Sequence, residues 1–152
     1  MRGTIFVALM FAALIENFVY AKDVPQLSQD ELNAAYKAAG LTERNGKWLD
    51  ACQQPTEPKN KVVDLNGDGQ PEVFVLVSDS SCYGLAGAQL SLLIKDKNGR
   101  WKSNFGFPAG DYRVLQAKTL GYPDIEIVGP GTCFPVWRWN GKEYAIFKRC
   151  DR

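Results

Sequence analysis

Residues 63–77, VDLNGDGQPEVFVLV, decide the fold, because an acidic, glycine-rich turn leads there into an unbroken run of strand-forming residues. Asparagine, aspartate and glycine tolerate a positive φ, so residues 66–69 fit a β-hairpin turn. Oxygen-bearing side chains alternate through this turn at Asp64, Asn66 and Asp68, and Glu72 follows. The stretch therefore predicts a hairpin, whose connection is either a plain turn or a turn that also holds a cation.

A Ca²⁺ site needs such an alternation, because several oxygen ligands on a tightly wound loop point toward one centre. An EF-hand requires a glutamate at its twelfth loop position, where this chain has Val75, so the loop is not an EF-hand. Its spacing resembles the calcium loop of FG-GAP repeats (integrin-propeller and VCBS type), which lies on a β-hairpin. Asn66 and Glu72 replace aspartates of that pattern but keep oxygen ligands. The resemblance implies at most one Ca²⁺, with the ligands Asp64, Asn66, Asp68 and Glu72.

An internal repeat extends this resemblance. Residues 71–75 (PEVFV) match residues 123–127 (PDIEI), and each run is followed by a cysteine-bearing loop and then by an Asn-Gly turn. Asn-Gly between strand-like runs is a strong hairpin signal, and Asn45-Gly46 gives the same signal earlier in the chain. The units span residues 62–102 and 113–147, and each resembles one blade of an FG-GAP propeller. Since a propeller needs about 4–8 blades to close, we expect a mainly β (α+β) fold, an antiparallel sheet or small sandwich of two propeller-blade-like units.

Residues 27–40 are expected to form a helix that packs on this sheet. Ser28 is a good N-cap, and Glu31 completes a capping box with it. Leu32 and Tyr36 lie on one face at helical spacing, and Gly40 is a typical stop signal.

The N-terminus predicts export. Residues 1–21 combine a positive start, a short apolar stretch and small residues before the expected cleavage site, as a secretory signal peptide does. The competing interpretation, a membrane anchor, is weaker because the apolar run is shorter than the ~20 residues that a spanning helix needs. Residues 22–152 would then form a single exported domain, which we place in the periplasm.

The cysteine count supports this compartment, because all 4 cysteines lie in the exported part. An even number there predicts two disulfides, and zinc is disfavoured because the chain has no histidine and no C-x-x-C pair. Sequence alone allows three connectivities. Cys82 and Cys133 occupy equivalent positions in the two units and are expected to pair, which leaves Cys52 for Cys150.

Charge and composition exclude several functions. A formal net charge of +1 argues against nucleic acid or an anionic membrane as the main partner. The absence of histidine removes the Ser-His-Asp and Cys-His nucleophile systems. The remaining acid–base option is the carboxylate pair Asp124 and Glu126, which we expect on a solvated strand face. The sequence therefore favours a protein that is not an enzyme.

Recognition of a protein partner is the function that remains. Several loops combine aromatic residues with glycine, and disulfides would hold them rigid, as suits a preorganised binding surface. Trp137 and Trp139 share one strand face, which is either core or an exposed platform. The candidate partner-binding residues are Tyr83, Phe105, Phe107, Tyr112, Phe134 and Trp137.

Three hypotheses follow. In class, the combination is similar to small periplasmic inhibitors of cell-wall hydrolases, namely immunity proteins of type VI secretion amidase effectors or lysozyme inhibitors, and this is the leading one. The first alternative is a calcium-stabilised envelope or adhesion module centred on Asp64 to Glu72. The second is a carbohydrate-active enzyme that uses Asp124 and Glu126. The oligomeric state is left open.

Overall fold

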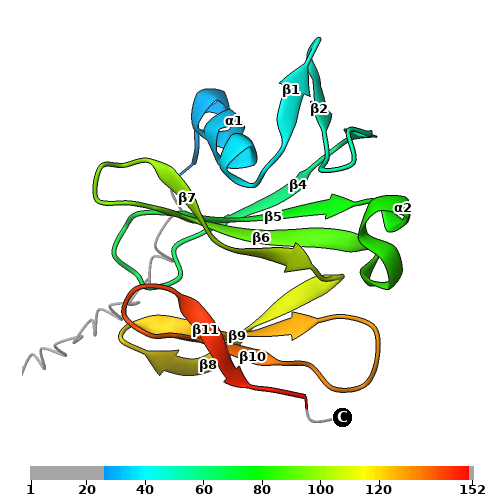
Figure 1. The fold of residues 1–152 in the computed structure, drawn as a ribbon. Helices are drawn as coiled ribbons and strands as arrows, with labels where there is room; N and C mark the ends of the chain where they lie inside the picture. Colours follow the sequence, from blue (N-terminus) through cyan, green and yellow to red (C-terminus); the bar gives the residue numbers. More distant parts are fainter. Residues whose placement is uncertain (1–25, 151–152) are drawn as a thin grey trace, which may run out of the picture.

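The computed structural model describes residues 26–150, so the predicted signal peptide lies outside the described residues. In this part of the chain, eleven strands form three antiparallel sheets, as the sequence predicted for a mainly β fold (Figure 1). The small sheet contains β1 (Thr42–Arg44), β2 (Lys47–Leu49) and β3 (Pro55–Thr56). The first large sheet contains β4 (Lys59–Val63), β5 (Glu72–Ser78), β6 (Ala88–Lys95) and β7 (Trp101–Pro108). The second large sheet contains β8 (Asp111–Thr119), β9 (Tyr122–Val128), β10 (Val136–Trp139) and β11 (Tyr144–Lys148).

Each large sheet is a meander of four strands that are consecutive in the chain. The matching runs 71–75 and 123–127 fall on β5 and β9, and the Asn-Gly turns connect β6 to β7 and β10 to β11. Both cysteine-bearing loops connect the second strand of a sheet to the third. The two predicted units therefore correspond to the two large sheets.

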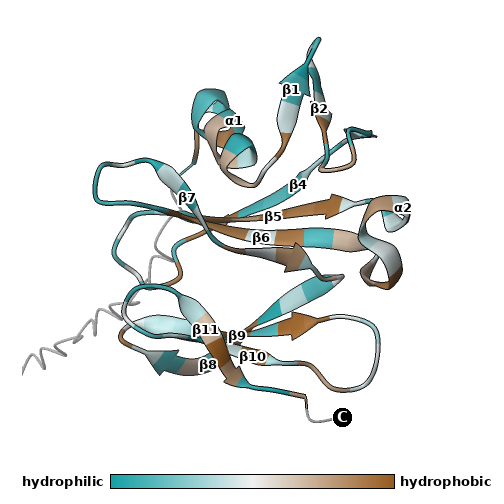
Figure 2. Cartoon of the chain, in the orientation of Figure 1, coloured by the Kyte–Doolittle hydropathy of each residue, from teal (hydrophilic) through white to brown (hydrophobic). Residues whose placement is uncertain are grey.

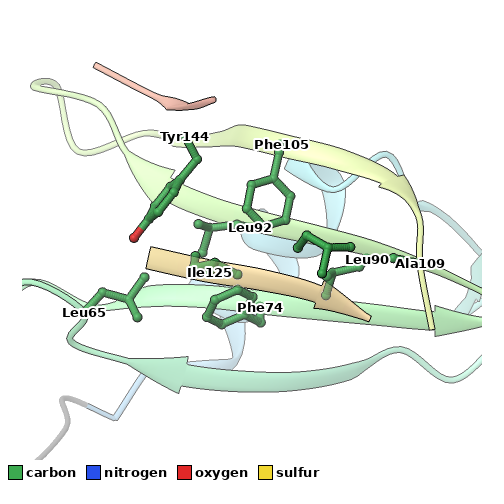
Figure 3. Packing of buried hydrophobic residues seen from close by; sticks show 9 residues of the cluster. Leu65, Phe74, Leu90, Leu92, Phe105, Ala109, Ile125 and Tyr144 are labelled. Carbon is green, nitrogen blue, oxygen red and sulfur yellow. The ribbon is translucent and has the colours of Figure 1, made fainter. Parts of the chain in front are cut away.

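The two large sheets pack face to face (Figure 1). Among the described strands, β5 is the most continuously hydrophobic, whereas polar residues interrupt the hydrophobic run of β6 (Figure 2). Alternation along β5 places Phe74 in the space between the sheets, while Val73 and Val75 lie on the opposite face. The buried residues between the sheets come from both of them (Figure 3): Leu65, Phe74, Leu90, Leu92, Phe105, Ala109, Ile125, Ile127 and Tyr144.

Helix α1 (Gln29–Ala38) begins at its N-cap Ser28, and the predicted capping box with Glu31 is present. Ala35 and Tyr36 of this helix are buried in a second hydrophobic cluster, together with residues of β5, β6 and β7. Lys95 of β6 forms an ion pair with Glu31 at 2.6 Å. The predicted hairpin turn at Asn45 and Gly46 joins β1 to β2, and both residues have the positive φ that a two-residue hairpin turn requires.

The predicted disulfide pairing is wrong. Cys52 pairs with Cys82, and Cys133 pairs with Cys150. Each bond joins the cysteine-bearing loop of one unit to a segment just outside that unit, so the equivalent cysteines do not meet. Two disulfides, in whatever pairing, are consistent with an exported protein. Within residues 26–150, no helix combines the length and apolar character needed to cross a membrane.

Candidate functional site

The acidic loop between β4 and β5 forms a self-contained turn. The Gly67 and Gly69 amides donate to the two oxygens of Asp64 at 2.8 and 2.9 Å. The Asp68 amide donates to Asn66 Oδ1 at 3.0 Å, and the Asn66 side-chain amide donates back to Asp68 Oδ2 at 2.9 Å. Such side-chain to backbone bonds stabilise tight turns. The predicted turn role of the loop is therefore present.

Glu72 lies behind this turn and is only 2% exposed. The Leu65 amide donates to its Oε2 at 2.7 Å, and the Tyr122 hydroxyl donates to its Oε1 at 3.3 Å. Burial raises the pKa of the Glu72 carboxyl to about 7, and the negative charges of Asp68 and Asp64 add to the rise. The turn thus presents three acidic side chains whose mutual repulsion a bound cation would reduce.

Calcium binding by this loop is compatible with its donor chemistry. All four predicted ligands offer oxygen atoms, and a carboxylate oxygen that accepts one amide still has a second lone pair. Amides of the loop itself also donate to oxygens of Asp64 and Asn66. The calcium site remains a prediction.

Most predicted partner-binding aromatics lie in or against the core. Phe105 is 6% exposed and belongs to the cluster between the large sheets, so it is not part of a binding surface. Phe107 stacks on Trp137 with ring centroids 4.9 Å apart. Tyr112 stacks on Phe74 at 3.8 Å. The half-buried Trp137 and Trp139 both pack against this cluster. Of the two alternatives for this pair, the structure shows core packing and not an exposed platform.

Tyr83 and Phe134 lie in the two cysteine-bearing loops. Tyr83 is half-buried and packs against the cluster beneath α1. Phe134 is also half-buried, and the guanidinium of Arg113 lies 5.3 Å from its ring centroid. Each of these two aromatic rings helps to anchor its loop.

The expectation that Asp124 lies on a solvated face is wrong. Asp124 is 2% exposed and forms a bidentate ion pair with Arg138, at 3.0 and 2.7 Å. The guanidinium of Arg138 is covered by the ring of Phe147, 3.3 Å from its centroid. Glu126, which is half-buried, bonds to Arg113 at 2.7 Å. Both carboxylates of the proposed catalytic pair therefore have an arginine partner.

Among the described residues, the most exposed large apolar side chain is that of Leu85, which is 94% exposed. It lies between two glycines with positive φ, Gly84 and Gly87, in the loop that joins β5 to β6. The sequence signal was available, namely an apolar residue flanked by glycines and next to a cysteine. This signal is weak, because an apolar residue flanked by glycines is equally common in a buried turn.

The loop that carries Leu85, residues 79–87, is tightly constrained; we call it the Leu85 loop. It contains the short helix α2 (Ser80–Tyr83) and the 3₁₀ turn η1 (Gly84–Ala86). Asp79 caps α2 by accepting the Ser81 amide at 2.8 Å and the Cys82 amide at 3.3 Å. The Asp79 amide donates to the Gly87 carbonyl at 3.1 Å, which closes the base of the loop. The bond between Cys52 and Cys82 ties the loop to the segment after β2.

The Leu85 loop and the loop after β9 emerge at the same end of the large sheets (Figure 1). The connection between β7 and β8 passes between them. A Cβ atom placed on Gly110 would lie 3.3 Å from the Ala86 carbonyl oxygen and 3.7 Å from the Val128 carbonyl oxygen. Because each of the two loops carries a disulfide, this end of the molecule presents two braced loops around one exposed leucine.

No known protein family matches the chain, and neither a curated protein nor a solved structure is similar enough to count as a relative.

Proposed function

We propose that this chain is a non-enzymatic, exported binding protein that inserts the Leu85 loop into the cleft of a protein partner. The observation that carries the proposal is the 94% exposure of Leu85 on a loop closed at its base and tied by a disulfide. An exposed apolar side chain on a mobile loop would lose conformational entropy on binding. A braced loop has lost most of that entropy already, so more of the burial free energy contributes to affinity.

The burial of one leucine is a modest but sufficient anchor. Full transfer of a leucine side chain out of water contributes roughly 1.5–3 kcal/mol, which corresponds to a tenfold or larger change in affinity. The neighbouring braced loop after β9 would flank the same cleft. We therefore expect Leu85 to be the central contact and the second loop to form the rim.

The partner class that we propose is a cell-wall hydrolase, and the compartment is the periplasm. Hydrolases that act on polymers have deep clefts, into which a rigid loop with an apolar tip can fit while it excludes substrate. The predicted signal peptide and the two disulfides support a partner met outside the cytoplasm.

The test is capture of partners from an envelope extract of the source cells, with the disulfide-intact chain as bait. Leu85→Ser is compared with Leu120→Ser, a matched control because Leu120 is 71% exposed in the turn between β8 and β9. We expect the wild type and Leu120→Ser to capture a hydrolase and to inhibit it, whereas Leu85→Ser does neither. Equal capture by both variants, or capture of no hydrolase by the wild type, would overturn the proposal.

The second candidate function is a calcium-stabilised envelope or adhesion module. It is favoured by the convergence of Asp64, Asp68 and the buried Glu72, whose pKa is raised in part by the other two charges. We expect Ca²⁺ to raise the melting temperature, and Asp64→Asn to abolish that rise if this loop is the site. If Asp64→Asn keeps the calcium-induced rise in melting temperature, this candidate is removed.

A further inference from the structure

Asp50 is a buried carboxylate with one oxygen that has no donor. It follows β2 and is 2% exposed. Its Oδ1 accepts the amides of Cys52 and Gln54, each at 2.9 Å, which holds the segment after β2 in a tight turn. Its Oδ2 is buried and, within the described residues, has no hydrogen-bond partner. A buried carboxylate oxygen without a donor loses its hydration and gains nothing in return.

A second carboxylate lies beside it. Asp79, the N-cap of α2, lies across the disulfide from Asp50: Asp50 accepts the amide of Cys52, Asp79 accepts the amide of Cys82, and these two cysteines are bonded. Its own Oδ1 already accepts the Ser81 hydroxyl at 2.6 Å as well as the two amides at the start of α2. The Ser81 hydroxyl and then the Ser81 amide lower the pKa of Asp79, so this side chain is charged at neutral pH.

The hydroxyl of Tyr83 is influenced by both carboxylates. Burial is the largest cause of the raised pKa of its hydroxyl, and the charges of Asp50 and Asp79 both add to it. A carboxylate oxygen of Asp50 also lies within 4.8 Å of the sulfur atoms of Cys52 and Cys82. The segment after β2 and the disulfide therefore lie beside the start of α2.

Two neighbouring carboxyl groups satisfy each other only if a proton or a cation lies between them, because an ionised carboxylate only accepts hydrogen bonds. The sulfur atoms do not fill this role, since they are joined in a disulfide and are not thiolates. Lysine and arginine do not fill it either, because no ion pair of Asp50 or Asp79 with a cationic side chain occurs within residues 26–150.

We propose that Asp50 and Asp79 bind one hard divalent cation, Ca²⁺ or Mg²⁺, at the foot of the Leu85 loop. Both ions prefer carboxylate and water oxygens, and a site with two carboxylates completes its coordination with water. Asp79 is only half-buried, so the ion and its waters have a path from solvent. The cation would clamp the loop to the segment after β2 at the same place as the disulfide.

This site is separate from the acidic loop, which lies at the opposite ends of the same strands (Figure 1). It also does not depend on the proposed binding function, because a cation at this position would stabilise the fold whether or not Leu85 contacts a partner. The two proposals therefore fail separately.

The experiment is a thermal melt of the disulfide-intact chain in EDTA and in about 10 mM Ca²⁺ or Mg²⁺, since a ligand that binds only the folded state raises its stability. We expect the cation to raise the melting temperature of the wild type by several degrees. Asp50→Asn and Asp79→Asn should lose this rise, and Asp50→Asn should melt higher than the wild type in EDTA because it removes the repulsion. Glu143→Gln, which changes an exposed glutamate in the turn after β10, is the control and should keep the rise.

Several outcomes would overturn the proposal: no rise in the wild type, a rise retained by Asp50→Asn, or a rise lost only in Asp64→Asn. A proton shared between the two carboxylates, which is the competing arrangement, predicts the first of these. If the aspartate variants do not fold, the site is tested by adding Mn²⁺ to the wild type and recording the broadening of its amide NMR signals. The amide signals of Cys52 and Ser81 should broaden before those of Gly67 and Gly69. The reverse order, or uniform broadening, would contradict the site.

Discussion

Glu72→Gln removes a buried negative charge while it preserves the shape of the side chain. The glutamine oxygen can still accept the Leu65 amide, and its amide group can donate to the Tyr122 hydroxyl in place of the present bond. We expect this substitution to stabilise the protein at neutral and alkaline pH. Substitution of a buried group is usually destabilising, so the predicted sign is unusual.

The magnitude follows from the pKa of Glu72, which folding raises from 4.5 to about 7. The folded protein therefore binds this proton more tightly than the unfolded chain does. The contribution of the Glu72 carboxyl to the free energy of unfolding is fully present below about pH 4.5. It falls as the pH rises toward 7 and stays low at higher pH. The loss amounts to roughly 3 kcal/mol, a large share of the 5–15 kcal/mol that typically stabilises a domain.

The assay is urea unfolding of the wild type and Glu72→Gln at pH 5 and pH 8, in EDTA so that no cation intervenes. This pH window isolates the group, because the chain contains no histidine and all its cysteines are in disulfides. The wild type should lose most of the ~3 kcal/mol between the two pH values, whereas Glu72→Gln should change little. Glu143→Gln, an exposed glutamate in the turn after β10, is the control and should behave as the wild type does.

Equal losses of stability by Glu72→Gln and the wild type between pH 5 and pH 8 would contradict the raised pKa of Glu72. A Glu72→Gln variant less stable than the wild type at pH 8 would contradict it as well. Either result would mean that the protein accommodates the ionised carboxylate without cost.

Three further substitutions test the packing and the crosslinks. Phe105→Ala should lower the free energy of unfolding by about 3–5 kcal/mol, as truncation of a core aromatic does. The folded fraction of this variant should still capture the partner. Loss of capture by a fully folded variant would mean that Phe105 contacts the partner. Asp124→Ala should lower the free energy of unfolding by about 3 kcal/mol, because it leaves the guanidinium of Arg138 without its partner. A loss below about 1 kcal/mol in urea unfolding, as for an exposed ion pair, would contradict a buried pair. Peptide mapping of the unreduced chain should recover Cys52 linked to Cys82, and replacing both by alanine should cost about 3–4 kcal/mol; recovery of any other pair would refute the connectivity.

Local sequence signals predicted the local structure well. The capping box at Ser28, the turn at Asn45 and Gly46 and the four-strand organisation of both units are all present. Each of these features depends on residues that are close in the chain, so propensity and spacing carry the information. The sandwich of two units also follows from a repeat count too small to close a propeller.

Features that depend on which surface is covered were not predictable. Alternation along β9 separates Ile125 from Asp124, but it does not reveal that Arg138 of the neighbouring strand covers the aspartate. Phe105 was predicted to lie on the surface for the same reason, because its sequence context does not reveal that the second large sheet covers it. The disulfide pairing failed for a related reason, since equivalent positions in two stacked sheets need not be adjacent in space.

The same distinction applies to the site residues: those that are close in the chain were predicted, and those that only the fold brings together were not. The acidic loop was found because its ligands are contiguous in sequence. Asp50 and Asp79 were not, because only the fold brings the segment after β2 to the start of α2. Leu85 was overlooked although its glycine neighbours mark it, since exposure is a property of the folded chain.

The most direct test of the central claim is site-specific photo-crosslinking in intact source cells. A photoreactive amino acid replaces Leu85 in one variant and Leu120 in a control variant, and mass spectrometry identifies the adducts. The account predicts an adduct from position 85 that joins the Leu85 loop to the substrate cleft of a cell-wall hydrolase, and none from position 120. The absence of a protein adduct at position 85, or the same adducts from both positions, would contradict the claim that this loop is the binding element.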